Sequence, residues 1–196
     1  MKIAFDLDEV LAGFLPALIE FHNKKHNKNL KLEDFNSYNF WEIWGGTREE
    51  AIDEVNDFHR IGYSSNIKPI KGAEEAIKEL KKDNELFVIT SRYEEVSDET
   101  RLWLEKYFPK TFSDVLFSGD FTKKIGAKTK KEYCDILGID VMVEDSFDFA
   151  HSCLDDKRIV ILLNYPWNKD RNVEGHNIIR VNTWEEIVKK INEIKK

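Results

Sequence analysis

The stretch of sequence that decides the fold is KIAFDLDEVLAGF, residues 2–14. It predicts a short buried strand that ends in two acids, Asp6 and Asp8. An unpaired buried carboxylate is costly, so Asp6 should lie at the end of the strand and face a positive charge. The two-residue spacing turns both carboxylates to one side of an extended segment, which suits one to bind Mg²⁺ while the other handles a proton. The plainer interpretation is a strand followed by an Asp-rich turn.

Apolar runs of the same kind recur along the chain and alternate with helical patterns. Five further strands are expected at residues 85–91, 114–118, 140–145, 158–164 and 177–181. Helical periodicity is found at residues 72–82, 95–108, 129–137 and 183–194. Apolar strands that alternate with helices predict an α/β fold, a three-layer, Rossmann-like parallel sheet covered by helices on both faces.

Residues 14–68 break this alternation, because they show helical periodicity and no convincing strand. We expect helices at residues 15–25 and 47–61, which form a small helical cap inserted after the first strand. The α/β core then comprises residues 1–13 and 69–196. Insertions after a parallel strand project from the carboxyl edge of the sheet, where ligands of open α/β folds bind. The cap is therefore predicted to cover a site.

An aromatic-rich segment, FNSYNFWEIW at residues 35–44, lies between the two expected cap helices. Aromatic rings suit the stacking of a nucleobase, which is worth about 1–3 kcal/mol per base. Phe40, Trp41 and Trp44 are the candidate substrate contacts. Packing within the cap explains the same cluster equally well, and both roles can hold together.

Two further strands end in side chains that suit a phosphate or metal site. The second strand leads into Thr90, Ser91 and Arg92, whose hydroxyls and guanidinium fit phosphate oxygens. The fourth strand ends with Glu144 and Asp145. Because parallel strands end at a common edge of the sheet, these groups should meet the two acids of the first strand.

A basic segment, KKIGAKTKK at residues 123–131, offers the positive charge that these acids need. Taken alone, such a cluster is usually a solvated face. Lys130 is the preferred phosphate-binding residue, because it falls in the first helical turn after Thr129 and can point along the sheet edge. Spacing alone leaves Lys128 and Lys131 open as alternatives.

Together these segments resemble the four motifs of the haloacid dehalogenase (HAD) superfamily of phosphotransferases, in the order FDLDEVLAGF, VITSR, Lys130 and VEDSFD. The resemblance implies that Asp6 attacks phosphorus to form an aspartyl-phosphate, while Asp8 protonates the leaving oxygen and then activates water. It also implies a Mg²⁺ ion held by the Asp6 carboxylate, the Asp8 backbone carbonyl and Asp145. The residues implied to bind the phosphoryl oxygens are Thr90, Lys130 and, in support, Ser91.

Within the superfamily, the opening DLDEVLA, the helical insertion, KPIKGAEEAIKEL and TSR are similar to those of 5'(3')-deoxyribonucleotidases. This likeness implies a Mg²⁺-dependent phosphomonoesterase for a nucleoside monophosphate. A phosphatase for another small metabolite, such as a sugar phosphate, is the alternative. A non-enzymatic binding module is disfavoured, because a protein that had lost catalytic activity would not need Asp6 and Asp8. Glu144 departs from the pattern, since many members of the superfamily have a second Asp there.

The composition limits the partners of the protein. With 30 Lys+Arg against 37 Asp+Glu the formal net charge is -7, which argues against a nucleic-acid polymer as partner. Apolar runs stay far below the roughly 20 residues of a membrane span, and neither a signal peptide nor a disulfide framework is indicated. We therefore expect a cytoplasmic protein without a membrane partner. The oligomeric state stays open, a homo-oligomer included.

A pair of histidines, His22 and His26, lies four residues apart in the first expected cap helix. Two imidazoles at this spacing share a helix face and suit a metal ion, but no third ligand is evident nearby in the sequence. Because the neighbouring residues are polar, we expect a solvated helix face.

Overall fold

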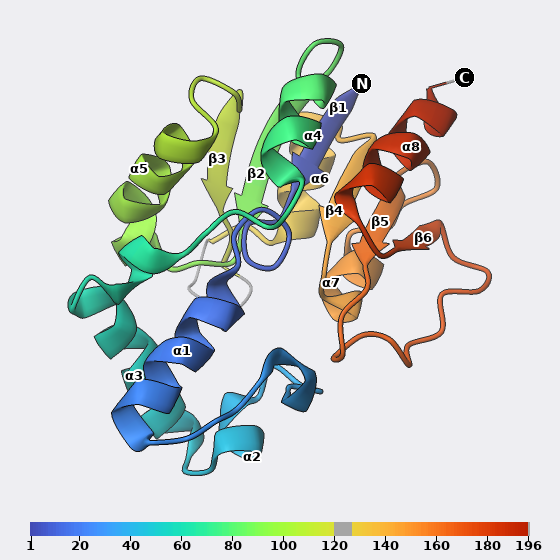
Figure 1. Ribbon diagram of the computed structural model, residues 1–196. Coiled ribbons are helices and arrows are strands. Elements are labelled where there is room, and N and C mark those ends of the chain that lie inside the picture. Colours follow the sequence, from blue (N-terminus) through green and yellow to red (C-terminus); the bar gives the residue numbers. More distant parts are fainter. Residues whose placement is uncertain (120–126, 196) are drawn as a thin grey trace.

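A parallel six-stranded sheet forms the centre of the molecule in the computed structural model, which describes residues 1–119 and 127–195 (Figure 1). The strands are β1 (Lys2–Phe5), β2 (Glu85–Thr90), β3 (Asp114–Phe117), β4 (Val141–Glu144), β5 (Ile159–Leu163) and β6 (Ile178–Val181). Their order is β3-β2-β1-β4-β5-β6, and every neighbouring pair is parallel. The order reverses at the junction of β1 and β4, where such folds bind their ligands.

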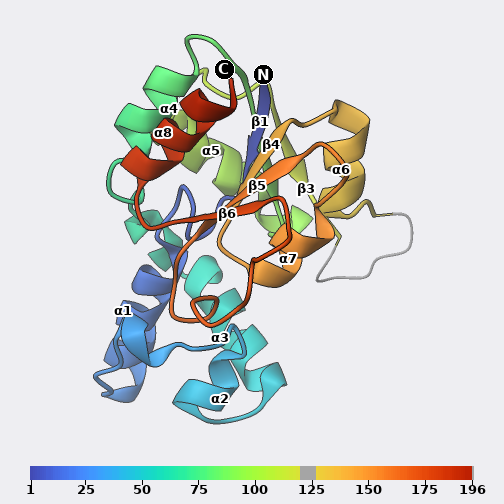
Figure 2. The same ribbon diagram turned by 90° about the vertical axis from the view of Figure 1, so that its right-hand side faces the viewer.

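Helices cover both faces of this sheet. Successive strand residues point to opposite faces, so Ile3 and Phe5 join one hydrophobic cluster and Ala4 joins the other. One face packs against α4 (Ala73–Leu80), α5 (Ser97–Tyr107) and α8 (Trp184–Ile194), and the other against α6 (Lys130–Leu137) and α7 (Phe147–Ser152), as Figure 2 shows. The predicted three-layer α/β fold is therefore confirmed, with α7 as a short helix that the sequence pattern did not predict.

The segment between β1 and α4 is helical and lies beyond the carboxyl ends of the strands (Figure 1). Its elements are α1 (Phe14–His26), η1 (Leu32–Asp34), α2 (Phe40–Trp44), α3 (Arg48–Arg60) and η2 (Tyr63–Asn66), and a further short turn, η3 (Glu94–Val96), precedes α5. Leu15 and Phe58 belong to the same hydrophobic cluster as Phe5 of β1, so the inserted helices pack on the core. No helix described in residues 1–119 and 127–195 is long and apolar enough to cross a lipid bilayer.

Two buried side chains, Trp184 and Glu9, hold the turn after β1 in place. The Trp184 indole stacks on Phe5 with ring centroids 5.6 Å apart, and its Nε1–H donates to the Val10 carbonyl at 3.0 Å. Glu9 is fully buried at φ 58°, and its carboxylate accepts the Leu15 backbone N–H at 2.7 Å at the start of α1. The loop that carries Asp6 and Asp8 is thereby tied both to α8 and to α1.

Candidate active site

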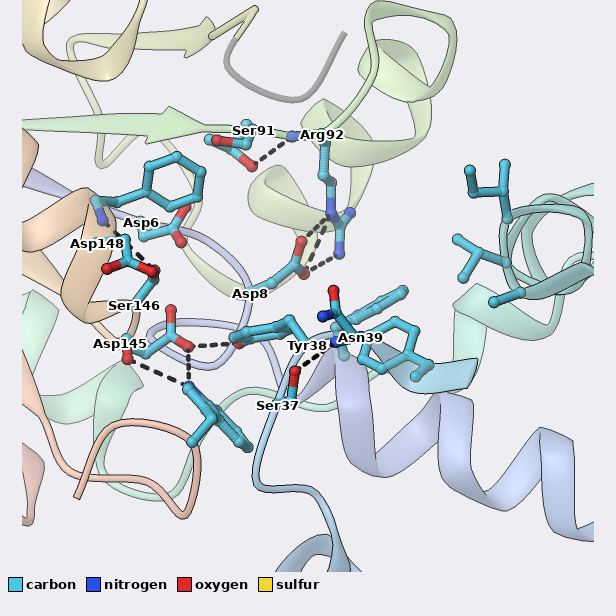
Figure 3. A pocket seen from close by; sticks show the side chains of 18 of the residues that line it. Asp6, Asp8, Ser37, Tyr38, Asn39, Ser91, Arg92, Asp145, Ser146 and Asp148 are labelled. Atoms are coloured by element: carbon cyan, nitrogen blue, oxygen red, sulfur yellow. Dashed lines mark hydrogen bonds and ion pairs between the residues drawn. The ribbon is translucent and has the colours of Figure 1, made fainter. Parts of the chain in front are cut away.

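The acids that follow β1 and β4 meet at the point where the strand order reverses. The Asp6 backbone N–H donates to the Val143 carbonyl at 2.9 Å, which continues the pairing of the two strands and sets Asp6 beside Asp145. Oxygen atoms of Asp6, Glu144 and Asp145 lie within 4.8 Å of one another. Figure 3 shows Asp6, Asp8 and Asp145 around the same cavity. The sequence prediction that these acids share one edge of the sheet agrees with this arrangement.

Lys130 is the lysine of the basic segment that reaches the acids, among the residues described. Its Nζ lies 2.9 Å from Asp6 Oδ1 and forms a second ion pair with Glu144, and the side chain is only 1% exposed. By contrast, Lys131 pairs with Asp135 on the surface, and the exposed Lys128 lies over the Tyr133 ring. Lys123 and Lys124 lie outside the described residues.

Burial and mutual repulsion disfavour the charged forms of the acids in this cluster. Burial raises the pKa of Asp6 well above its usual value, and Glu144 and Asp145 add to the rise, while Lys130 opposes it. Burial, followed by repulsion from Glu144, raises the pKa of Asp145 to about 7. A second cation beside Lys130 would reduce the repulsion between these carboxylates. Because the donors are all carboxylate oxygens, the cluster fits a hard cation such as Mg²⁺.

Arg92 holds Asp8 at the edge of this cluster. Its Nε–H and Nη2–H donate to the two Asp8 carboxylate oxygens at 2.9 and 2.6 Å. The Thr90 hydroxyl accepts the Arg92 backbone N–H at 3.2 Å, and the Ser91 and Ser118 hydroxyls lie 3.0 Å apart. The sequence placed Arg92 among the phosphate contacts, whereas the folded protein pairs it with a carboxylate, because two partly buried opposite charges attract each other at this edge.

Two residues to which the sequence assigned no catalytic role hold Asp145. The Tyr38 hydroxyl and the Trp167 Nε1–H, the latter at 2.9 Å, both donate to Asp145 Oδ2. The Asn168 amide donates to the Asp145 carbonyl at 2.6 Å. Tyr38 comes from the aromatic segment and Trp167 from the loop after β5. The only sequence signal for the second was that NYPWN, residues 164–168, interrupts the alternation of strands and helices.

A cavity of about 620 Å³ joins these groups to the inserted helices. Its lining includes Asp6, Asp8, Asp145, Thr90, Ser91 and Arg92 from the edge of the sheet, and Phe40 and Trp41 from α2. Trp44 is not among the lining residues: its indole stacks on the His22 ring, with centroids 4.4 Å apart. We therefore do not retain Trp44 as a substrate contact, because its indole already stacks on His22. The volume suits a ligand of nucleotide size.

Comparisons with known proteins agree with these features. A family model described as "5' nucleotidase, deoxy (Pyrimidine), cytosolic type C protein" matches residues 1–196. A 5'(3')-deoxyribonucleotidase of Bacillus subtilis is 28% identical over 194 residues, covering 96% of this chain and 97% of that protein.

Solved structures share the fold. A haloacid dehalogenase-like hydrolase of Streptococcus pneumoniae superposes with a TM-score of 0.68 at 10% identity, covering 97% of each chain. The HAD-family protein YfnB of Bacillus subtilis, solved bound to magnesium, superposes with a TM-score of 0.60 at 17% identity, covering 97% of this chain and 98% of that one. At these identities the likeness concerns the fold alone.

Proposed function

Since the chain belongs to the family of cytosolic type C 5'-deoxynucleotidases and is a phosphoric monoester hydrolase, we propose that it acts as a 5'(3')-deoxyribonucleotidase on a nucleoside monophosphate. One observation carries the proposal: Asp6, paired with Lys130, and Asp145 lie at a cavity whose wall includes the aromatic side chains of Phe40 and Trp41. The cluster suits a phosphate group and the wall suits a base.

Asp6 is the proposed nucleophile. Its carboxylate oxygen attacks phosphorus to form an aspartyl-phosphate, and the nucleoside oxygen leaves with a proton from Asp8. Asp8 then takes a proton from the water that attacks the same phosphorus atom, which releases inorganic phosphate and restores Asp6. Lys130, 2.9 Å from Asp6, lowers the repulsion between this carboxylate and the phosphate oxygens.

Asp6, Asp145 and the Asp8 backbone carbonyl are the proposed Mg²⁺ ligands. When bound, the ion supplies positive charge that offsets the phosphate anion and the crowded carboxylates. Tyr38 and Trp167 both hold Asp145 through Oδ2, which leaves Oδ1 as its metal ligand. Glu144 serves a different purpose, because it pairs with Lys130 and accepts the Asp145 and Ser146 backbone N–H groups at 3.1 and 3.2 Å.

Thr90, Ser91 and Lys130 are the proposed phosphate contacts. Arg92 orients Asp8 through its Nε–H and Nη2–H donors, and substrate phosphate is proposed as a further partner. We propose that residues 14–68 act as the cap and that residues 1–13 and 69–196 form the core. The Tyr38 hydroxyl then links the cap directly to a metal ligand.

The base is proposed to stack on Phe40 or Trp41. Trp41→Ala should lower kcat/KM for a deoxyribonucleoside monophosphate by about 5- to 150-fold, the equivalent of about 1–3 kcal/mol. Hydrolysis of p-nitrophenyl phosphate, which has no base, should stay nearly unchanged. Trp44→Ala is the matched control: it removes an indole that packs inside the cap, so it should lower thermal stability and affect both substrates alike.

A substrate screen completes the test. Purified protein with Mg²⁺ is offered deoxyribonucleoside and ribonucleoside monophosphates, sugar phosphates and p-nitrophenyl phosphate. Nucleotidase function predicts the highest kcat/KM with a nucleoside monophosphate. If sugar phosphates are turned over faster than every nucleotide and Trp41→Ala does not separate the substrates, the sugar-phosphate alternative replaces this proposal.

A further inference from the structure

A second cluster of metal-ligating side chains lies in the inserted helices, apart from the acids at the sheet edge. His22 and His26, one turn apart on α1, both face Glu54 of α3. His22 Nδ1 lies 2.9 Å from Glu54 Oε1, and His26 Nε2 lies 2.9 Å from Glu54 Oε2. Figure 1 shows α1 running away from the sheet with α3 alongside. The expectation of a solvated face is wrong for His22, because α3 brings Glu54 against it.

The cluster is enclosed on most sides. The His22 residue is 4% exposed and Glu54 8%, whereas the His26 side chain is 40% exposed and leaves an entry from solvent. The Trp44 indole covers His22, with an interplanar angle of 8°. An ion could therefore reach the cluster from the His26 side and would be shielded on the His22 side.

The donor atoms stand at a spacing that suits a common ion. Around a metal with bonds of about 2.0–2.2 Å to nitrogen and oxygen, neighbouring ligand atoms are about 2.9–3.5 Å apart. Both nitrogen–oxygen contacts in the cluster have this length, and one ligand atom from each residue lies within 4.8 Å of the others. A hydrogen-bonded His–Glu–His chain gives the same contacts, so spacing alone does not separate the two interpretations.

The identity of the donor atoms favours a metal ion. Two imidazoles and one carboxylate are the ligand set of three-residue zinc sites that keep a fourth position for water.

We propose that His22, His26 and Glu54 bind one divalent transition-metal ion of the Zn²⁺ class, which joins α1 to α3 and stabilises the cap. Imidazole nitrogen favours such ions, whereas the oxygen-only cluster at Asp6 and Asp145 favours Mg²⁺. The two sites therefore differ in the ion they select. This inference stands independently of the nucleotidase function.

The test is a Zn²⁺ titration of the chelator-treated full chain in excess Mg²⁺, which occupies the carboxylate site. Bound zinc is measured by calorimetry and by the shift of histidine imidazole resonances, so enzymatic activity does not enter the readout. The wild type should bind one equivalent and melt at a higher temperature with zinc. His26→Gln alters a partly exposed ligand and should still fold, so it is the principal variant. It should weaken binding by about 100-fold or more and abolish the rise in melting temperature.

Glu54→Gln is the second ligand variant and should show the same loss. His151→Gln is the matched control, because the exposed pair of His151 and His176, with rings 5.0 Å apart, is another place where zinc could bind adventitiously. It should bind zinc as the wild type does. Absence of zinc binding by the wild type overturns the proposal. So does binding that survives His26→Gln, or binding that is lost in His151→Gln.

Discussion

Replacing Lys130 by methionine removes the only cation described within ion-pair distance of both Asp6 and Glu144. The side chain is 1% exposed, so neither carboxylate gains water in its place. A pair of unit charges 2.9 Å apart interacts by about 6 kcal/mol at an effective dielectric constant of about 20. Burial of the ammonium offsets part of this, and breaking a buried pair generally costs about 3–5 kcal/mol. We expect Lys130→Met to lower the free energy of unfolding by that amount.

The loss should depend on pH in a defined direction. Burial raises the pKa of Asp6 in the folded protein and Lys130 opposes that rise, so the variant raises the folded-state pKa further. When the pKa of an acid is higher in the folded than in the unfolded protein, ionisation of that acid destabilises the fold. This destabilisation grows as the pH rises above the pKa of the unfolded state, which is about 4 for Asp. The deficit of Lys130→Met should therefore be largest near pH 8 and shrink towards pH 5.

Urea unfolding followed by circular dichroism, with EDTA present throughout, measures this free energy. Lys131→Met is the matched control, because Lys131 is the next residue and pairs with Asp135 at 3.1 Å on the surface. It should stay within about 0.5 kcal/mol of the wild type. A Lys130→Met protein within about 1 kcal/mol of the wild type at pH 8, or a deficit that does not change with pH, would refute the reasoning.

Asp6→Asn should reduce turnover by at least about 10³-fold while phosphate still binds, because the nucleophile is lost and the packing is kept; steady-state phosphate release at the wild-type rate would exclude the aspartyl-phosphate route. Asp145→Asn should raise the Mg²⁺ concentration for half-maximal activity at least 10-fold, and far more than Glu144→Gln does; the reverse order would show that Glu144 is the ligand. Tyr38→Phe should lower the free energy of unfolding by about 1–3 kcal/mol without Mg²⁺, because buried Asp145 loses a donor, and by less with it. An equal loss in both conditions, measured by urea unfolding, would contradict that role for Mg²⁺.

The sequence by itself determined the layered α/β fold and the side chains that end its strands. Apolar runs and helical periodicity are local signals, and the parallel order that follows from them brings Asp6 and Asp145 to one edge. Local signals also miss short elements. α7 has only six residues, which are too few for a helical period to be recognised. Sequence spacing favoured Lys130 but did not exclude Lys128 and Lys131. The three lysines are distinguished by burial, which spacing along the chain does not reveal.

Only the tertiary structure decided which distant side chains meet. Tyr38 and Asp145 are 107 residues apart, and His22 and Glu54 are 32 apart. A periodic pattern records which face of an element is buried, but it contains nothing about the residue on the opposing element. Three contacts depend on how helices and loops pack over the sheet edge. They are the ion pair of Asp8 with Arg92, the stacking of Trp44 on His22 and the hydrogen bond of Trp167 to Asp145. Their partners are therefore fixed by packing and hydrogen-bond satisfaction across the whole chain.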